Sequence, residues 1–451
     1  MRRLTILLIL LGAMQFVLPL DGATSGTGAG GTRTLMTFGF LILAAVTVGE
    51  LAKAINVPKL VGYLVAGLVF GPHVIGVFDR QSVSDLAGVS TLAVALIAFL
   101  AGAELQWEEL KRRWRVILTM LASEMTASLI AITVTLFVLR AFVPALSGPV
   151  GQAFVLCLLV ASILVVHSPA VTMALLSETG AKGEMARTTL GIVLVADMVV
   201  ILLFSLTTSL ARAVGAETTV VDASFALLMW EIFGGILIGA ILGGLVSLYL
   251  RWQTGELFIF AIAVALFGVE LAKAAHVETL IMLLTAGFVM ENMSRGRGEI
   301  LRHAMERSAA PASAKNTTNT GAKIVPSEVL ALSAVAVPVV LARMLGIWRG
   351  SLLGAKWSNA VPAVRDHAWK GLISQAGVAI GLATVLATNL PGIGRSLQAL
   401  ILSVIAINEM MGAIFFRRGI EAAGEMPSEE NRPSGAIMNP LDPAANSARV
   451  V

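Results

Sequence analysis

Residues 167–204 read "HSPAVTMALLSETGAKGEMARTTLGIVLVADMVVILLF" and contain the features that decide the fold. A Ser-Pro pair, Ser168 and Pro169, interrupts one apolar segment; a short basic loop follows, and a second apolar segment carries a carboxylate, Asp197, near its middle. A charge at the centre of a membrane span costs about 3 kcal/mol or more unless it is paired, hydrated or protonated. The stretch therefore predicts two membrane-spanning helices, of which the first is broken and the second carries a functional carboxylate.

The composition of the whole chain is that of a helical membrane protein. Hydrophobic residues make up 57% of its 451 residues and charged residues 13%, whereas soluble proteins carry about 25% charged residues. Apolar stretches of about 17–25 residues recur along the chain, as spanning helices require, and no alternation typical of a membrane barrel is visible. The single cysteine, Cys157, excludes an internal disulfide, and no Cys/His spacing indicates zinc. The net charge of +4 is no indication of nucleic-acid binding, because basic residues of membrane proteins concentrate in cytoplasmic loops.

We predict an all-α polytopic membrane protein with about thirteen transmembrane helices after an N-terminal segment. Residues 1–34 are expected to be a signal peptide or a first membrane anchor followed by a Gly/Thr-rich linker. Residues 35–420 are expected to form the transmembrane domain and 421–451 a disordered cytoplasmic tail. The expected spans are 35–51, 58–78, 89–106, 115–143, 151–176, 188–211, 224–250, 255–273, 277–293, 309–325, 329–347, 370–389 and 397–416.

The charges of the connecting loops predict the orientation. Lys and Arg concentrate in alternate loops, for example in "KRRWR" at 111–115 and in Arg417–Arg418 after the last span, whereas the intervening loops hold few basic residues. The positive-inside rule places the basic loops in the cytoplasm. We therefore expect a multi-pass membrane protein whose C-terminus is cytoplasmic.

Two halves of the chain resemble each other. "LVGYLVAGLVFGP" at 60–72 matches "LIMLLTAGFVMEN" at 280–292, "AGAEL" at 101–105 matches "TGAKI" at 320–324, and "VLVAD" ending at Asp197 matches "IAINE" ending at Glu409. In the predicted span order the two halves are separated by an odd number of crossings, which predicts two inverted repeats. Secondary transporters have this architecture, with their ion sites near the bilayer midplane, between the repeats.

Two further ionisable residues, Glu124 and Arg343, fall inside predicted spans at equivalent places in the two halves. A buried ion pair between them would lower the cost of placing both charges in hydrocarbon. Alternatively, Arg343 lies near enough to a helix end for its side chain to reach the cytoplasmic surface. The sequence leaves both interpretations open.

The predicted ion site lies beside the interrupted span. Pro169 removes an amide donor, and the freed carbonyls together with the hydroxyls of Ser168 and Thr172 would be hard oxygen ligands for a small cation beside Asp197. The functional interpretation is that a proton and a cation compete for Asp197. The bland interpretations are a permanently protonated, hydrogen-bonding Asp197 and a simple helix kink at Pro169.

The equivalent span of the second half has a polar centre without proline, formed by Ser374, Gln375 and Gly377. Two interrupted helices that cross there would complete the site, with their half-helix dipoles facing each other. We expect His167 to be a packed polar residue rather than a ligand. Glu409 is either a second titrating group or a structural hydrogen-bonding residue, and we favour the structural role.

The chain resembles the monovalent cation:proton antiporter-2 family, the bacterial sodium/hydrogen exchanger group. The resemblance covers about 40–420 and is carried by "PKLVGYLVAGLVFGPHVIG", "AFLAGAEL", the stretch 167–204 and "GLISQAGVAIGLA". It implies a protein of the bacterial inner membrane, with a six-helix ion-binding core that moves against a dimerisation domain in a homodimer. It also implies that Asp197 is the ion-binding aspartate and that Arg343 stands where members carry Lys or Arg.

The chain departs from the family pattern in two places. Many members have Asp or Asn before the key aspartate, where this chain has Ala196, which favours a one-for-one electroneutral exchange. The segment "PASAKNTTNTGAKI" at 311–324 is unusually polar for a span; it either lines a water-filled cavity or inserts poorly.

The predicted function is that of a secondary active antiporter exchanging Na⁺ or K⁺ for H⁺, with no cofactor. The alternative is a sodium-coupled symporter of an organic anion on a similar inverted-repeat fold, and a non-transporting sensor with the same fold also stays open. An intramembrane aspartyl protease would need a second aspartate sharing a proton with Asp197, and none lies in a predicted span. HExxH and P-loop patterns are also absent, so we do not expect an enzyme.

Overall fold

The computed structural model of the chain describes residues 29–55, 57–77, 87–214, 229–252, 257–294, 301, 314, 317–322, 324–375, 378–390 and 392–426. Regular secondary structure in these residues is entirely helical, as predicted. The α-helices of the first half are α2 (Ala29–Ala54), α3 (Lys59–Phe70), α5 (Ala87–Ala103), α6 (Trp107–Val138), α7 (Val150–Leu164), α8 (Pro169–Thr179) and α9 (Glu184–Ala213). Those of the second half are α11 (Gly235–Trp252), α12 (Leu257–Ala275), α13 (Thr279–Met293), α15 (Pro326–Ala331), α16 (Ser333–Trp357), α17 (Pro362–His367), α18 (Val378–Asn389) and α19 (Gly394–Ala422).

Short helical turns join or extend these elements. Two 3₁₀ turns, η1 (Arg140–Phe142) and η2 (Pro144–Leu146), connect α6 to α7, and a third, η4 (Ala368–Leu372), follows α17. A single π-helical turn, η3 (Trp230–Gly234), leads into α11.

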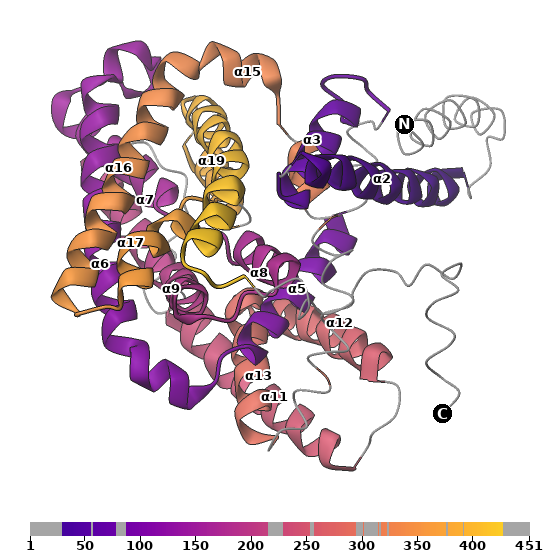
Figure 1. Ribbon diagram of the computed structural model, residues 1–451. Coiled ribbons are helices and arrows are strands. Elements are labelled where there is room, and N and C mark those ends of the chain that lie inside the picture. The colour runs from indigo at the N-terminus through magenta and orange to yellow at the C-terminus, as the bar shows by residue number, and fades with distance from the viewer. Residues whose placement is uncertain are drawn as a thin grey trace.

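The helices gather into three packed groups (Figure 1). The largest apolar core is built from α6, α7, α9, α16 and α19 with their connecting turns. A second core joins α5 to α11, α12 and α13, and a small third core joins α2 to α3. Helices α8 and α9 supply side chains to the first two cores: Val171 and Val193 to the first, and Met173 and Leu194 to the second. They therefore lie at the boundary between the two large groups.

Helices α6 and α16 lie side by side along most of their lengths, because α16 presents glycines to α6 (Figure 1). A β-carbon at Gly346, Gly350 or Gly354 would come closer than 3.0 Å to backbone atoms of α6. The contact places Gly350 directly against Glu124. Small residues on one face thus bring the backbones of the two charge-bearing helices together.

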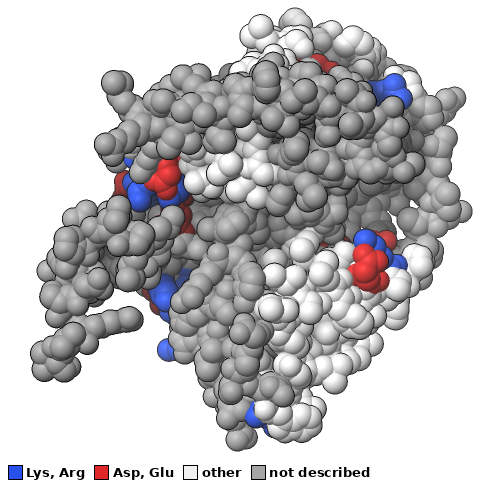
Figure 2. All heavy atoms as spheres, turned by 90° about the vertical axis from the view of Figure 1, so that its right-hand side faces the viewer, with Lys and Arg blue, Asp and Glu red and all other residues white. Residues whose placement is uncertain are grey.

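The surface of the helices is apolar in the way that a bilayer requires. Six helical segments are long and apolar enough to cross a membrane, and they are Leu110–Val138, Val150–Thr179, Glu184–Ala211, Trp230–Trp252, Ser333–Trp357 and Gly394–Ala422. Shorter apolar helices cover Lys59–Phe70, Thr279–Met293 and Val378–Ala387. On α11 the exposed side chains Leu237, Ile241 and Leu245 form one stripe. On the described part of one face, charged side chains are confined to a few small clusters (Figure 2).

The structure refines several predicted boundaries. The predicted span 329–347 is two helices: α15 ends at Ala331, and α16 continues ten residues farther, to Trp357. Within the polar segment 311–324, residues 317–322 are helical, and Thr317, Thr318 and Asn319 are buried. Residues 1–28 and 427–451 lie outside the described residues, so the signal or anchor segment and most of the tail stay predictions, as does the count of about thirteen spans.

Candidate functional site

The first helix break, a non-helical interruption within a membrane-spanning segment, separates α7 from α8. Helix α7 ends at Leu164, residues 166–168 are not helical, and α8 begins at Pro169, whose missing N–H suits the first position of a helix. The hydroxyl of Ser168 caps α8 by accepting a hydrogen bond from the N–H of Val171 at 3.2 Å. The break predicted from the Ser-Pro pair is therefore present, and it leaves backbone carbonyls that need other donors.

The second helix break separates η4 from α18. Residues 373–375 are not helical, and α18 begins at Val378; Gly377, predicted to be part of this break, lies outside the described residues. Ser374 and Gln375 are both buried. The amide of Gln375 donates to the carbonyl of Leu164 at 2.5 Å, so the two breaks lie against each other.

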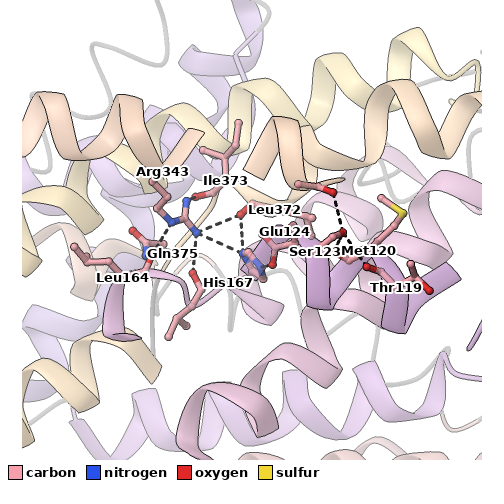
Figure 3. A network of polar contacts seen from close by, with 12 residues as sticks. Thr119, Met120, Ser123, Glu124, Leu164, His167, Arg343, Leu372, Ile373 and Gln375 are labelled. Carbon is pink, nitrogen blue, oxygen red and sulfur yellow. Dashed lines mark hydrogen bonds and ion pairs between the residues drawn. The ribbon is translucent and has the colours of Figure 1, made fainter. Parts of the chain in front are cut away.

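Arg343 of α16 donates hydrogen bonds to backbone carbonyls at both helix breaks (Figure 3). Its Nε donates to the carbonyl of Leu164 at 2.7 Å and its Nη2 to that of Val166 at 2.8 Å, both at the first break. Its Nη1 donates to the carbonyl of Ile373 at 2.6 Å, at the second break. The guanidinium is fully buried, so the predicted alternative in which Arg343 reaches the surface is wrong. The five fixed donors of an arginine suit this task, since several carbonyls converge on one place.

His167 lies between Glu124 and the second break (Figure 3). Its Nε2 is 2.7 Å from Glu124 Oε1, and its Nδ1 is 2.7 Å from the carbonyl of Leu372. A carbonyl can only accept, so Nδ1 donates in the 2.7 Å contact with Leu372. Arg343 Nη2, itself a donor, lies farther from Nδ1, at 3.4 Å. Among the described residues Glu124 thus pairs with His167, and the predicted direct pair with Arg343 is wrong in this form. The reason is tertiary: the non-helical backbone of the first break inserts the imidazole between the two charges.

Asp197 lies in the membrane-spanning part of α9 and is 7% exposed. Its Oδ1 has no hydrogen-bond partner among the described residues, and neither has the buried hydroxyl of Thr172 on α8. The preceding residue, Ala196, is fully buried in the first core. Helices α8 and α9 pack against each other, but no hydrogen bond joins Asp197 to Ser168 or Thr172. Carboxylate and hydroxyl oxygens without donors are the groups that a hard cation prefers.

One contributor to the network was not predicted as a site residue. Asn408 of α19 is fully buried, and its Nδ2 donates to Gln375 Oε1 at 2.7 Å. The signal in the sequence is the polar pair "NE" at 408–409 within an apolar helix. The described residues contain no cluster of three or more His, Cys, Asp or Glu side chains arranged to hold a metal.

The profile of the transmembrane sodium/hydrogen exchanger family matches residues 40–416. The chain belongs to this family. Its fold and family are those of a transporter and not of an enzyme.

Two curated relatives and two solved structures are also similar to this exchanger-family chain. It is 27% identical over 144 residues to the Na⁺/H⁺ antiporter NhaP of Pseudomonas aeruginosa, covering 32% of this chain and 34% of that protein. It is also 27% identical over 173 residues to the probable Na⁺/H⁺ antiporter 3 of Methanocaldococcus jannaschii, covering 37% and 39%. The matched region thus spans between a third and two fifths of these relatives.

The solved structures show that the likeness extends to the whole fold. The structure of the sodium proton antiporter MjNhaP1 from M. jannaschii at pH 8 is similar over 87% of this chain and 96% of that chain, with a TM-score of 0.63 and 15% identity. An electron-microscopy structure of the same antiporter gives a TM-score of 0.65 at 15% identity, over 88% and 99%. At this identity the likeness concerns the fold alone.

Proposed function

We propose that this chain is a secondary active antiporter that exchanges a monovalent cation, Na⁺ or K⁺, for H⁺. The observation that carries the proposal is Asp197, a buried carboxylate in a membrane-spanning helix whose Oδ1 has no donor among the described residues. Because a buried, unpaired carboxylate is costly, it is stabilised by binding either a proton or a cation. The two ligands exclude each other at one carboxylate, which is the requirement for exchange.

Alternating access is supported by the place of α8 and α9. Both helices contribute to the core around α6 and α16 and to the core around α5 and α13. A movement of one group of helices against the other would therefore expose Asp197 first to one side of the membrane and then to the other. The bonds of Arg343 to both breaks would keep the site intact during this movement.

Glycine contacts support the proposal that the halves are inverted repeats. A β-carbon at Gly67 of α3 would overlap the carbonyl of Thr318, and one at Gly287 of α13 would overlap the carbonyl of Phe99. Gly67 and Gly287 occupy the same place in the two matching stretches of sequence. Gly321 against Leu64 and Gly102 against Leu284 form a second such pair of equivalent contacts. Each half thus packs a helix onto the other half through the same glycine positions.

The remaining parts of the proposal follow the sequence and the family. A single acidic residue at the key position, after Ala196, favours one-for-one electroneutral exchange. The family resemblance favours a bacterial inner membrane, and the loop charges favour a cytoplasmic C-terminus. The apolar stripes on the surface suit contact with lipid or with a second copy in a homodimer.

The test is exchange in proteoliposomes that contain the full chain. A pH gradient is imposed, Na⁺, K⁺ or Li⁺ is added in turn, and the internal pH is followed with a dye. We expect a cation-dependent pH change in the wild type and its loss in Asp197→Asn. Asp366→Asn, which changes an exposed aspartate paired with Arg365, is the matched control and is expected to exchange normally.

Three results would contradict parts of the proposal. No pH change with any cation would exclude antiport, and sodium-dependent uptake of an organic anion would favour the symporter. Full exchange by Asp197→Asn would remove Asp197 from the site. Exchange that accelerates with an imposed membrane potential would exclude electroneutrality.

A further inference from the structure

Helix α19 carries a buried carboxylate that the proposed exchange does not use. Glu409 is 3% exposed, and its Oε2 has no hydrogen-bond partner among the described residues. The structural role that the sequence favoured would require a donor for this oxygen. A buried polar atom without a partner costs about 1–3 kcal/mol, and more when it is charged.

Glu409 lies near the face of α19 that packs against the second helix break. Gly412, three residues farther along the helix, packs so closely on Ser374 that a β-carbon at Gly412 would overlap the Ser374 side chain and backbone. Asn408 donates to Gln375 at the same break. Because residues three and four apart share one face of a helix, Asn408 and Glu409 both lie within one turn of the contact with Ser374.

The two segments that meet here carry three buried oxygens without donors. Ser374 Oγ and Asn408 Oδ1 are buried and, like Glu409 Oε2, have no hydrogen-bond partner among the described residues. Asn408 is held in position, because its Nδ2 is already bonded to Gln375, and this leaves its carbonyl oxygen available. A carboxylate, an amide oxygen and a hydroxyl form an oxygen-only set, which suits an alkali cation and offers nothing to a soft metal.

We propose that Glu409, Asn408 and Ser374 form a second binding site for a monovalent cation, at the second helix break. Its composition parallels that of the proposed first site, in which Asp197 is predicted to bind the cation together with Ser168 and Thr172. The matching sequences that end in Asp197 and Glu409 place the two carboxylates at corresponding points of the two halves. The inference rests on the proposed function in one respect, which is that the ligand is the transported cation.

Binding to the purified full chain tests this site separately from transport. Calorimetric titration with NaCl, and then with KCl and LiCl, is carried out against choline chloride at constant ionic strength. Asp197→Asn removes the first carboxylate and is expected to retain cation binding. Asp197→Asn/Glu409→Gln is expected to bind no cation. Asp197→Asn/Glu270→Gln, which changes an exposed carboxylate on α12, is the control and should bind like Asp197→Asn.

A milder variant covers the event that the Glu409 variant does not fold. Ser374→Ala in the Asp197→Asn background removes one hydroxyl and should raise the dissociation constant at least about threefold. The proposal is overturned if Asp197→Asn binds no cation, if Glu409→Gln in a folded protein leaves its binding unchanged, or if Ser374→Ala leaves the dissociation constant unchanged. Wild-type liposomes without exchange would contradict the proposed function and leave this binding result standing.

Discussion

Replacing Arg343 by methionine should destabilise the protein at the place where the two helix breaks cross. The substitution keeps a long side chain of similar reach on α16, but it removes the donor that the carbonyls of Val166 and Ile373 have at 2.8 and 2.6 Å. The carbonyl of Leu164 keeps only the amide of Gln375 as a donor. Val166 and Ile373 belong to non-helical backbone, so no neighbouring helical amide replaces the guanidinium there.

The magnitude follows from two opposing effects. Removing the buried guanidinium relieves its desolvation cost, which favours the variant. Each orphaned carbonyl costs about 1–3 kcal/mol, and breaking a buried charged network by removing one partner costs about 3–5 kcal/mol in total. The second effect is larger, since the carbonyls cannot move away without unwinding α7 or η4. At about 2–4 °C per kcal/mol, we expect the apparent melting temperature to fall by at least about 6 °C.

The assay is thermal unfolding of the detergent-solubilised chain, followed by the fluorescence of its seven tryptophans. Arg349→Met is the matched control on the same helix, because Arg349 is exposed and its guanidinium lies over the ring of Trp348. A cation–π contact at an exposed site contributes about 0.5–1 kcal/mol, so the control should melt within about 4 °C of the wild type. If Arg343→Met melts as high as Arg349→Met, the guanidinium does not stabilise the breaks and the reasoning fails.

Three other perturbations test the packing around the site. Gly102→Leu and Gly287→Leu should abolish accumulation of folded protein, because their β-carbons would overlap the carbonyls of Leu284 and Phe99. Gly244 faces open space, so Gly244→Ala is the control and should express normally. Equal yields of the three variants would refute the close helix crossing. Glu425→Gln should lower stability by about 1 kcal/mol, because the Glu425 carboxylate accepts from the N–H groups of Met185 and Ala186 at the start of α9; faster hydrogen exchange at those amides is the readout, Glu421→Gln is the control, and unchanged exchange would contradict the cap. Cys157 is fully buried, so a maleimide should label it only after unfolding, and rapid labelling of the native protein would show that α7 is packed differently.

The sequence was sufficient for the features that depend on local composition. Length and apolarity predicted helices, the Ser-Pro pair at Ser168 predicted the first break, and an isolated carboxylate in an apolar run drew attention to Asp197. The matching glycine stretches could be read from the chain because close helix crossings need glycine at fixed positions. These features follow from the residue types and their spacing, with no knowledge of what lies opposite.

What only the tertiary structure decided is which groups meet at the crossing. The sequence offered Glu124 and Arg343 as an ion pair or as separate charges, but it could not show that His167 inserts between them or that Arg343 bonds carbonyls at both breaks. Backbone carbonyls have no signature in a sequence, because every residue has one, and only the fold decides which of them lose their helical partner. For the same reason the sequence could not show that Asn408 bonds Gln375 or that α19 passes directly beside Ser374.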